Sequence, residues 1–172
     1  MSQPGVTSVA FRQAMSCFAT GVTVVTTISD GRPYGLTVSA FCSVSLDPLL
    51  VLVSLQQSSQ TLALIQQSGC FAVNVLAAQQ QPLAQRFARK DRLSRSFGDI
   101  PHHRGVLDVA LFDEALARLE CLVAGIYPGG DHILLLGKVS AVEWNDDMQA
   151  SQPLLFYRST FRGVQPEPLS PV

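Results

Sequence analysis

The feature that most constrains the fold is an alternation of apolar and polar residues between Tyr34 and Val44. Even-numbered positions in this stretch are apolar, whereas odd-numbered positions are nearly all small and polar. Because successive side chains of a strand point to opposite faces of a sheet, the pattern predicts one long strand, with one face toward the core and the other toward something polar. The next segment, 49–55, is almost wholly apolar and predicts a strand covered on both sides.

Several further strands and a few short helices are expected along the chain. Strands rich in apolar and β-branched residues are predicted at 22–28, 70–76, 116–127, 132–144 and 153–161. Helices are predicted at 9–20, 58–65 and 79–88. Because helices do not alternate regularly with strands, the order predicts a mainly β protein: an antiparallel barrel with a few flanking helices.

The composition favours a single globular domain with few charges. The chain has 172 residues, a net charge of −1 and only 15% charged residues, against about 25% in an average protein. These values argue against a disordered chain and against nucleic-acid binding through bulk charge, and no apolar run has the length of a membrane span. So low a charge content indicates either an unusual core or a surface that is partly hidden against a second copy or a ligand.

The two ends and the cysteines complete this first description. We expect a flexible N-terminus at 1–8, a domain at 9–162 and a loose tail at 163–172, with no secretory signal at the start. The cysteine spacing fits neither a zinc site nor a thioredoxin motif, and each cysteine lies in an apolar segment. We therefore expect four small buried residues in a reducing cytoplasm, and no metal site.

Two polar stretches are candidates for a ligand site. Thr37 and Ser39 place small hydroxyls on a strand whose backbone would be accessible to a flat heteroaromatic ring. The run 58–61 lies where a helix begins, and backbone N–H groups at a helix N-terminus suit a phosphate. Together the stretches fit a nucleotide-like cofactor; separately, each is also ordinary, since half-exposed strands have polar faces and serine is a common N-cap.

Three other features admit two interpretations each. His132 follows the turn Gly129–Asp131 and can project into a cleft near a substrate, or merely start a strand. Asn74, in an apolar strand, needs either structural partners or a ligand. The stretch 86–104 holds six of the twelve basic residues and can contact dinucleotide phosphates, or be a solvated loop.

An ordered set of motifs resembles a known family. The pieces, in chain order, are 11–15 (FRQAM), 18–26 (FATGVTVVT), 35–41 (GLTVSAF), 43–48 (SVSLDP), 59–61 (SQT), 69–76 (GCFAVNVL), 130–132 (GDH), 137–139 (GKV) and 153–158 (PLLFYR). From about residue 9 to 162 the chain is similar to the flavin reductase-like domain with the FMN-binding split-barrel fold. It departs from the family at Leu36, where methionine is frequent, and at Ser159-Thr160, which replaces a glycine-containing turn.

The resemblance implies a fold, an activity and a set of site residues. The fold would be an antiparallel Greek-key split β-barrel with a few flanking helices. The activity would be that of a cytoplasmic NAD(P)H-dependent flavin reductase, which transfers hydride from NADH or NADPH to FMN or FAD and supplies reduced flavin to a partner monooxygenase. The family also implies a homodimer. The residues implied are His132 beside the nicotinamide and, around the flavin, Thr37, Val38, Ser39, Ala40, Ser54, Ser59 and Thr61.

Two other functions fit the same residues. A flavin-binding electron carrier or storage protein would use the same fold without NAD(P)H activity of its own. A related split-barrel protein would oxidise a pyridoxal-type substrate or bind another planar cofactor, because fold alone does not fix function.

Overall fold

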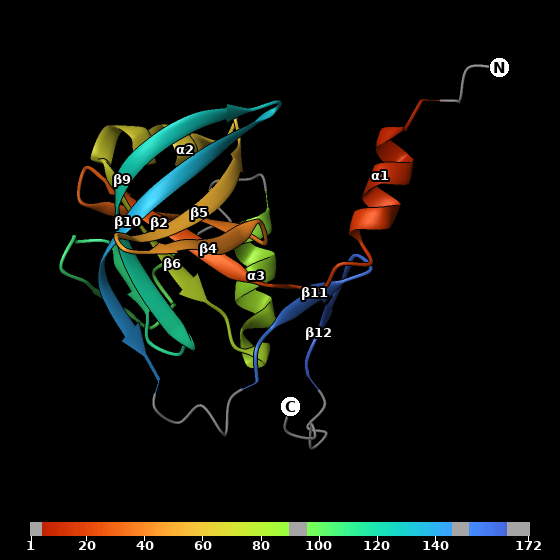
Figure 1. Ribbon diagram of the computed structural model, residues 1–172. Helices are drawn as coiled ribbons and strands as arrows, with labels where there is room; N and C mark the ends of the chain where they lie inside the picture. Colours follow the sequence, from red (N-terminus) through yellow and green to blue (C-terminus); the bar gives the residue numbers. More distant parts are fainter. Residues whose placement is uncertain (1–4, 90–95, 146–151, 165–172) are drawn as a thin grey trace.

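The fold is built around one curled antiparallel sheet, seen in the computed structural model of Figure 1. The structure describes residues 5–89, 96–145 and 152–164. Within these, seven strands pair in the order β3-β2-β6-β9-β10-β5-β4, and each neighbouring pair is antiparallel. Their bounds are β2 Thr23–Ser29, β3 Arg32–Val38, β4 Phe41–Leu46, β5 Leu49–Gln56, β6 Cys70–Val75, β9 Ala117–Gly129 and β10 His132–Trp144. The predicted mainly β, antiparallel class is confirmed.

Smaller elements surround this sheet. Five short strands form two further sheets: β1 Thr20–Gly21, β11 Leu155–Tyr157 and β12 Thr160–Arg162 in one, β7 His102–Arg104 and β8 Ala110–Phe112 in the other. The helical segments are α1 Ser8–Met15, α2 Gln60–Ser68, the 3-10 turn η1 Ala78–Gln80 and α3 Gln81–Ala88. No helix in the described part of the chain is long and apolar enough to cross a membrane. The terminal segments expected to be loose lie partly outside the described residues.

The long strand predicted from Tyr34 to Val44 is wrong, because the chain breaks at Ser39 and Ala40 into β3 and β4. β3 pairs with β2, whereas β4 pairs with β5 at the opposite end of the sheet. The break also inverts the alternation: even-numbered Val38 is buried, but beyond the break it is odd-numbered Phe41 that packs against the core. The alternation keeps the same period across Ser39 and Ala40, so it does not indicate where the chain stops pairing with β2 and begins to pair with β5.

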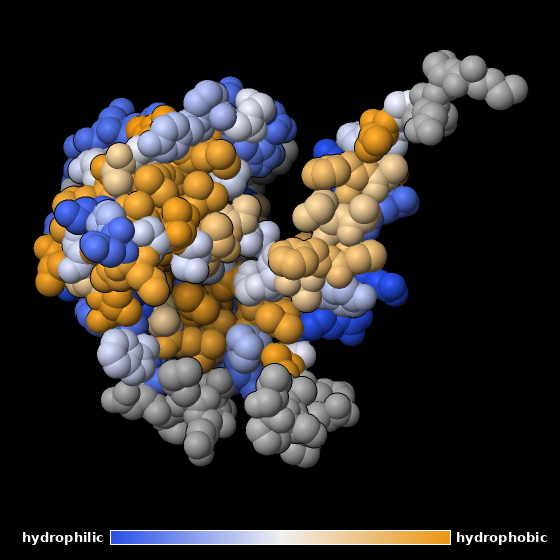
Figure 2. Space-filling view, viewed as in Figure 1, coloured by the Kyte–Doolittle hydropathy of each residue, from blue (hydrophilic) through white to orange (hydrophobic). Residues whose placement is uncertain are grey.

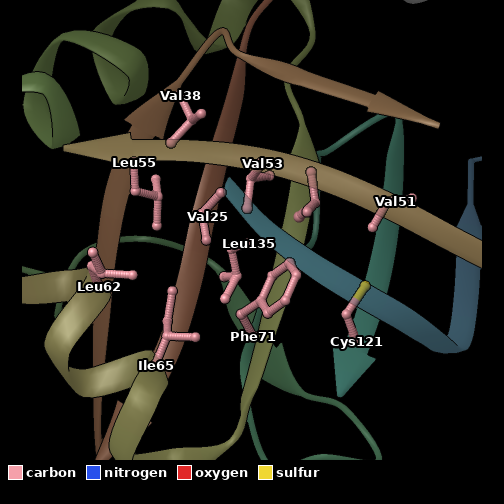
Figure 3. Close-up of a cluster of buried hydrophobic side chains, with 11 residues drawn as sticks. Val25, Val38, Val51, Val53, Leu55, Leu62, Ile65, Phe71, Cys121 and Leu135 are labelled. Atoms are coloured by element: carbon pink, nitrogen blue, oxygen red, sulfur yellow. The ribbon is translucent and has the colours of Figure 1, made fainter. Parts of the chain in front are cut away.

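The prediction that β5 is covered on both sides is also wrong for this chain alone. Its residues alternate: Val51, Val53 and Leu55 are buried, while Leu50 and Leu52 between them are only half-buried. Figure 3 shows the inner residues meeting Phe71 of β6 and Ile65 of α2 in the main core. The outer face of the sheet therefore carries apolar side chains that nothing in the described chain covers.

That outer face is a continuous apolar surface. Cross-strand register places Cys42, Leu52 and Leu136 in one row, and Leu50 and Lys138 in the next. Figure 2 shows hydrophobic side chains gathered on the barrel where β4, β5 and β10 lie in Figure 1. We call this surface the outer sheet face; its apolar members are Cys42, Leu50, Leu52, Leu122, Leu134 and Leu136.

The helix predicted at 9–20 is shorter and does not pack on the barrel. α1 ends at Met15 and none of its residues is buried. Phe11 and Met15, with Phe18 beyond the helix, are each at least half exposed. Figure 1 shows α1 standing away from the sheet beside the β11–β12 hairpin.

Only half of the cysteine prediction is confirmed. Cys70 and Cys121 are buried, but Cys17 and Cys42 are exposed, and none of the four forms a disulfide. Burial raises the pKa of the Cys121 thiol to about 12. Cys42 itself lies on the outer sheet face and not in the core, which is why the apolar pattern around it misled.

Asn74 is a structural residue. Its Nδ2 donates to Val24 O at 3.2 Å, and its Oδ1 accepts from Phe112 N at 2.8 Å. The side chain is fully buried and thereby ties β6 to β2 and β8. Of the two interpretations open from the sequence, structural pairing is the one observed.

Replacing Asn74 by alanine should destabilise the protein by about 2–4 kcal/mol, because it leaves a buried backbone N–H without a partner and removes packing. Urea unfolding would measure this. Gln66→Ala on the exposed side of α2 is the control and should change stability by less than about 0.5 kcal/mol. Equal stability of the two variants would show that the Asn74 hydrogen bonds contribute little.

Candidate functional site

A hollow of about 560 Å³ opens beside the break between β3 and β4. Five segments meet there: the end of β3, the end of β5, the N-terminus of α2, the last residue of α3 and the first residue of β10. We call it the strand-break hollow. Its lining is Leu36, Val38, Ser39, Ala40, Ser54, Leu55, Gln56, Ser58, Ser59, Gln60, Ala88 and His132. Six of the eight residues expected at the site, distant in sequence, are thus brought together: Val38, Ser39, Ala40, Ser54, Ser59 and His132.

At the break both backbone carbonyls already accept a hydrogen bond, whereas both N–H groups lack a backbone partner in the described chain. The Ser39 carbonyl accepts from Phe41 N at 3.1 Å, and the Ala40 carbonyl accepts from Ser54 N at 3.0 Å. The N–H groups of Ser39 and Ala40 have no backbone partner within the described residues. Both residues are exposed. Two adjacent amide donors on an exposed turn suit a ligand edge that carries hydrogen-bond acceptors.

The imidazole of His132 is held at the rim by its neighbours in the β9–β10 turn. Its Nδ1 lies 2.7 Å from Asp131 Oδ1, and this hydrogen bond lowers the pKa of the Asp131 carboxyl. Gln57 anchors the turn from the β5–α2 loop, donating from its backbone N to Asp131 O at 3.1 Å and from Nε2 to Gly130 O at 2.8 Å. The ring is thus oriented from one side, and His132 lines the hollow as well as starting β10.

Ser59 is the residue at which α2 begins. Its Oγ accepts from Leu62 N at a long 3.5 Å, and Gly69 closes the helix in the left-handed region at φ 71°. Ser58, Ser59 and Gln60 all line the hollow, so the first turn of the helix faces it. The partial positive charge of a helix N-terminus at this position favours an anionic group.

Thr37 and Thr61 are not in the strand-break hollow. The Thr37 hydroxyl donates to Ala84 O at 2.7 Å and so holds β3 against α3. Thr61 is buried in α2 and lines a neighbouring, smaller hollow. Each threonine is adjacent in sequence to residues that line the strand-break hollow, but its own side chain lies on the opposite face of its strand or turn.

The basic stretch 86–104 is engaged within the chain at both ends. Arg86 binds Asp99 through two bonds of 2.5 and 2.7 Å, and this pairing lowers the pKa of the Asp99 carboxyl. Arg104 Nη1 lies 3.1 Å from Asp108 Oδ1. Lys90, Arg92 and Arg95 lie outside the described residues, so the expected contact between this stretch and cofactor phosphates stays a prediction.

A second large hollow, of about 580 Å³, lies between α1 and the barrel and was not anticipated from the sequence. Phe11 and Met15 line one side, and Phe41 and Leu52 the other. This α1 groove shares Ser39, Ala40 and Ser54 with the strand-break hollow, so the two meet at the break. The only sequence signal was the apolar spacing at 11, 15 and 18, which predicted a helix and in the structure forms one wall of this groove.

Comparison with known proteins gives consistent matches over nearly the whole chain. A sequence model of the family described as "Flavin reductase like domain" matches residues 15–165. The reductase subunit HsaB of a flavin-dependent monooxygenase from Rhodococcus jostii is 37% identical over 161 residues, which are 94% of this chain and 80% of that protein.

Solved structures agree with this match. Nitrilotriacetate monooxygenase component B from Mycobacterium thermoresistibile superposes with a TM-score of 0.90 at 35% identity, covering 95% of this chain and 90% of that one. The NADH:FAD oxidoreductase SgcE6 of Streptomyces globisporus, solved in complex with NAD and FAD fragments, gives a TM-score of 0.85 at 34% identity, covering 93% and 94%.

Truncating Gln57 should loosen the turn that carries His132. In Gln57→Ala the side-chain bond to the Gly130 carbonyl is lost, and a bond of this kind contributes about 1 kcal/mol. Amide exchange at residues 129–132 is therefore expected to be about fivefold faster by NMR. Gln56→Ala is the matched control, because Gln56 is the adjacent residue and its side chain makes no hydrogen bond in the described chain. Equal exchange in both variants would remove Gln57 as the anchor.

Proposed function

The chain belongs to the flavin reductase-like domain family, and we propose that it transfers hydride from NADH to a flavin, FMN or FAD, and supplies the reduced flavin to a monooxygenase. One observation from the structure supports this most directly. Ser39 and Ala40, whose amides have no backbone partner in the described chain, line a hollow that is also lined by Ser54, the start of α2 and His132. The parts needed for a ring, a phosphate and a second ring are therefore in one place.

The residues present fit a flavin. A flavin ring edge carries acceptors at N1 and at the C2 carbonyl, and the Ser39 and Ala40 turn offers two N–H donors with both carbonyls already bonded. The ribityl phosphate matches the helix N-terminus at Ser59. When bound, the flavin supplies the ring that accepts the hydride.

The chain's own contribution is binding and orientation. The Ser39 and Ala40 amides would donate to the N1–C2 edge of a bound flavin and stabilise negative charge there, so that the protein would need no catalytic base for this. His132 lines the hollow, and its ring would orient a bound nicotinamide through a hydrogen bond to the nicotinamide amide.

We propose a homodimer in which a second copy covers the outer sheet face. Two features support it. The outer sheet face holds six apolar residues without cover, and the apolar side of α1 stands free beside it (Figure 2). Interface cores are depleted in charge, and the chain has only 15% charged residues. The α1 groove then lies next to both the break and the interface, which places each flavin near the second subunit.

The cytoplasm is the proposed compartment, since four cysteines without a disulfide fit a reducing environment. The proposed domain remains 9–162, with His132 as the candidate catalytic residue.

The activity is tested by mixing the purified protein with NADH and FMN or FAD and following NADH consumption. Flavin-dependent consumption is expected. In His132→Ala, kcat/KM for NADH should fall about tenfold, the loss expected from one hydrogen bond to the substrate. His103→Ala, an exposed histidine outside the hollow, is the matched control and should match the parent.

Absence of flavin-dependent NADH or NADPH consumption would contradict the proposal. Tight, stoichiometric flavin with negligible turnover would instead identify an electron carrier. An unchanged kcat/KM in His132→Ala would remove His132 from the mechanism without affecting the assignment of the activity.

The dimer is tested with a charge on the outer sheet face. Leu122 is 46% exposed, so Leu122→Glu should leave the subunit folded but shift sedimentation toward the monomer at micromolar concentration. Val106→Glu, on a loop residue that is 76% exposed, is the control and should remain dimeric. A parent protein that sediments as a stable monomer would contradict the proposed assembly.

A further inference from the structure

The hairpin formed by β4 and β5 ends in an exposed apolar tip. Leu46, at the end of β4, is 87% exposed, and Leu49, at the start of β5, is 49% exposed. Asp47 between them is exposed as well, and its carboxylate forms no ion pair within the described residues. We call residues 46–49 the β4–β5 tip. Exposed leucines beside one free carboxylate suit a surface that is both apolar and positively charged.

The α1 groove has this complementary chemistry. Its apolar walls are Phe11, Met15, Phe18, Phe41, Leu52 and Phe156. The two charged residues that line it, Arg12 on α1 and Arg158 between β11 and β12, are both cationic. Neither arginine forms an ion pair within the described part of the chain. Figure 2 shows the groove open between α1 and the barrel, so an apolar segment that carries a carboxylate fits it in shape and in charge.

The tip does not reach the groove of its own chain, because the two lie at opposite ends of one hairpin. The groove meets the hairpin at Phe41, Cys42 and Leu52. From Cys42 to Leu46, β4 extends about 13 Å away from that end at the usual rise per residue. If the tip fills a groove, it is therefore the groove of another copy.

A two-fold axis brings tip and groove together. The proposed dimer packs two outer sheet faces against each other, and an isologous interface relates them by half a turn about an axis within the interface. Leu50 belongs to the outer sheet face and pairs with Ser45, midway between the tip and the groove. An axis that crosses the hairpin near Leu50 places the tip of each copy over the groove of the other.

We propose that the partner's β4–β5 tip fills the α1 groove of each subunit. Leu46 and Leu49 of the partner subunit pack against the apolar walls, and the partner's Asp47 lies between Arg12 and Arg158. The inference rests on the proposed homodimer and names the segments that meet in it. It accounts for a helix with no buried residue, because α1 then packs against the second subunit.

The same contact completes the candidate flavin site. The α1 groove shares Ser39, Ala40 and Ser54 with the strand-break hollow, so the partner's tip covers the hollow on that side. A single subunit leaves this side open to water. Dimerisation and flavin binding are therefore coupled, and separating the subunits weakens the binding of FMN.

A charge exchange tests the contact. Asp47→Lys places a cation beside two arginines in both copies of the contact, so the dissociation constant of the dimer, measured by sedimentation, should rise at least about tenfold. Arg12→Glu should also raise it. With both changes in one chain the facing charges are opposite again, and the constant should return to within about threefold of the parent. Glu114→Lys, the same charge change on an exposed residue outside the groove, is the control and should match the parent.

A thiol on the tip tests the geometry. Leu46→Cys, in a chain that also carries Cys17→Ser, is treated with a short bismaleimide. A dimer band is expected on a denaturing gel, with position 46 of one subunit joined to Cys42 of the other, because Cys42 is exposed and lines the groove. Mass spectrometry identifies the joined peptides, and a further Cys42→Ser change should remove the band. Val106→Cys in the same background is the control, on an exposed loop residue, and should give no link to Cys42.

Two results would overturn the proposal: a dimer whose dissociation constant is unchanged by Asp47→Lys, or the absence of any link between position 46 and Cys42. Both leave the proposed activity intact, because flavin-dependent NADH consumption by the parent is measured separately. A parent protein that sediments as a monomer would contradict the proposed homodimer and this contact together.

Discussion

The structure depends on the interruption at Ser39 and Ala40, which separates strand β3 from strand β4. At Ser39 and Ala40 the chain leaves its pairing with β2 and passes from β3 to β4, the two end strands of the sheet, and the hydrogen bond from Ser54 N to Ala40 O begins the pairing with β5. Because both carbonyls at the break are bonded, the two amides are the groups left to face the hollow. The N-terminus of α2 and His132 are brought to the same point by the strands on either side. The candidate ligand site therefore lies where the chain changes its pairing partner from β2 to β5.

The same break connects the site to the surface. The α1 groove meets the strand-break hollow at Ser39, Ala40 and Ser54, and its walls merge with the outer sheet face at Cys42 and Leu52. A low charge content, an uncovered apolar sheet face and a helix with no buried residue are separate observations. A second subunit on this side accounts for all three. Cofactor binding and assembly would then share one set of residues.

The sequence predicted the element types well because local chemistry fixes them. The turn at Asp30 and Gly31, the end of α2 at Gly69 and the start of β10 at His132 each follow from residue preferences, and each is observed. The break at Ser39 was missed because it depends on which strand the chain pairs with next, and a constant period carries no such information. For the same reason Cys42 and Leu52 were predicted to be buried in the core. An apolar residue in a strand can be buried by its own chain or by another molecule, and the sequence pattern does not distinguish the two. The Thr37 and Thr61 side chains were placed at the site by motif, whereas the face of each element turns them away from it.

The central claim is that the Ser39 and Ala40 amides bind the flavin edge. The most direct measurement is the backbone amide NMR spectrum of the full chain titrated with FMN. The account predicts that the amide resonances of Ser39 and Ala40 shift strongly and downfield, as expected for N–H groups that gain an acceptor, while Ser43 on β4 changes little. Shifts confined to other segments, with Ser39 and Ala40 unmoved at saturating FMN, would contradict the account.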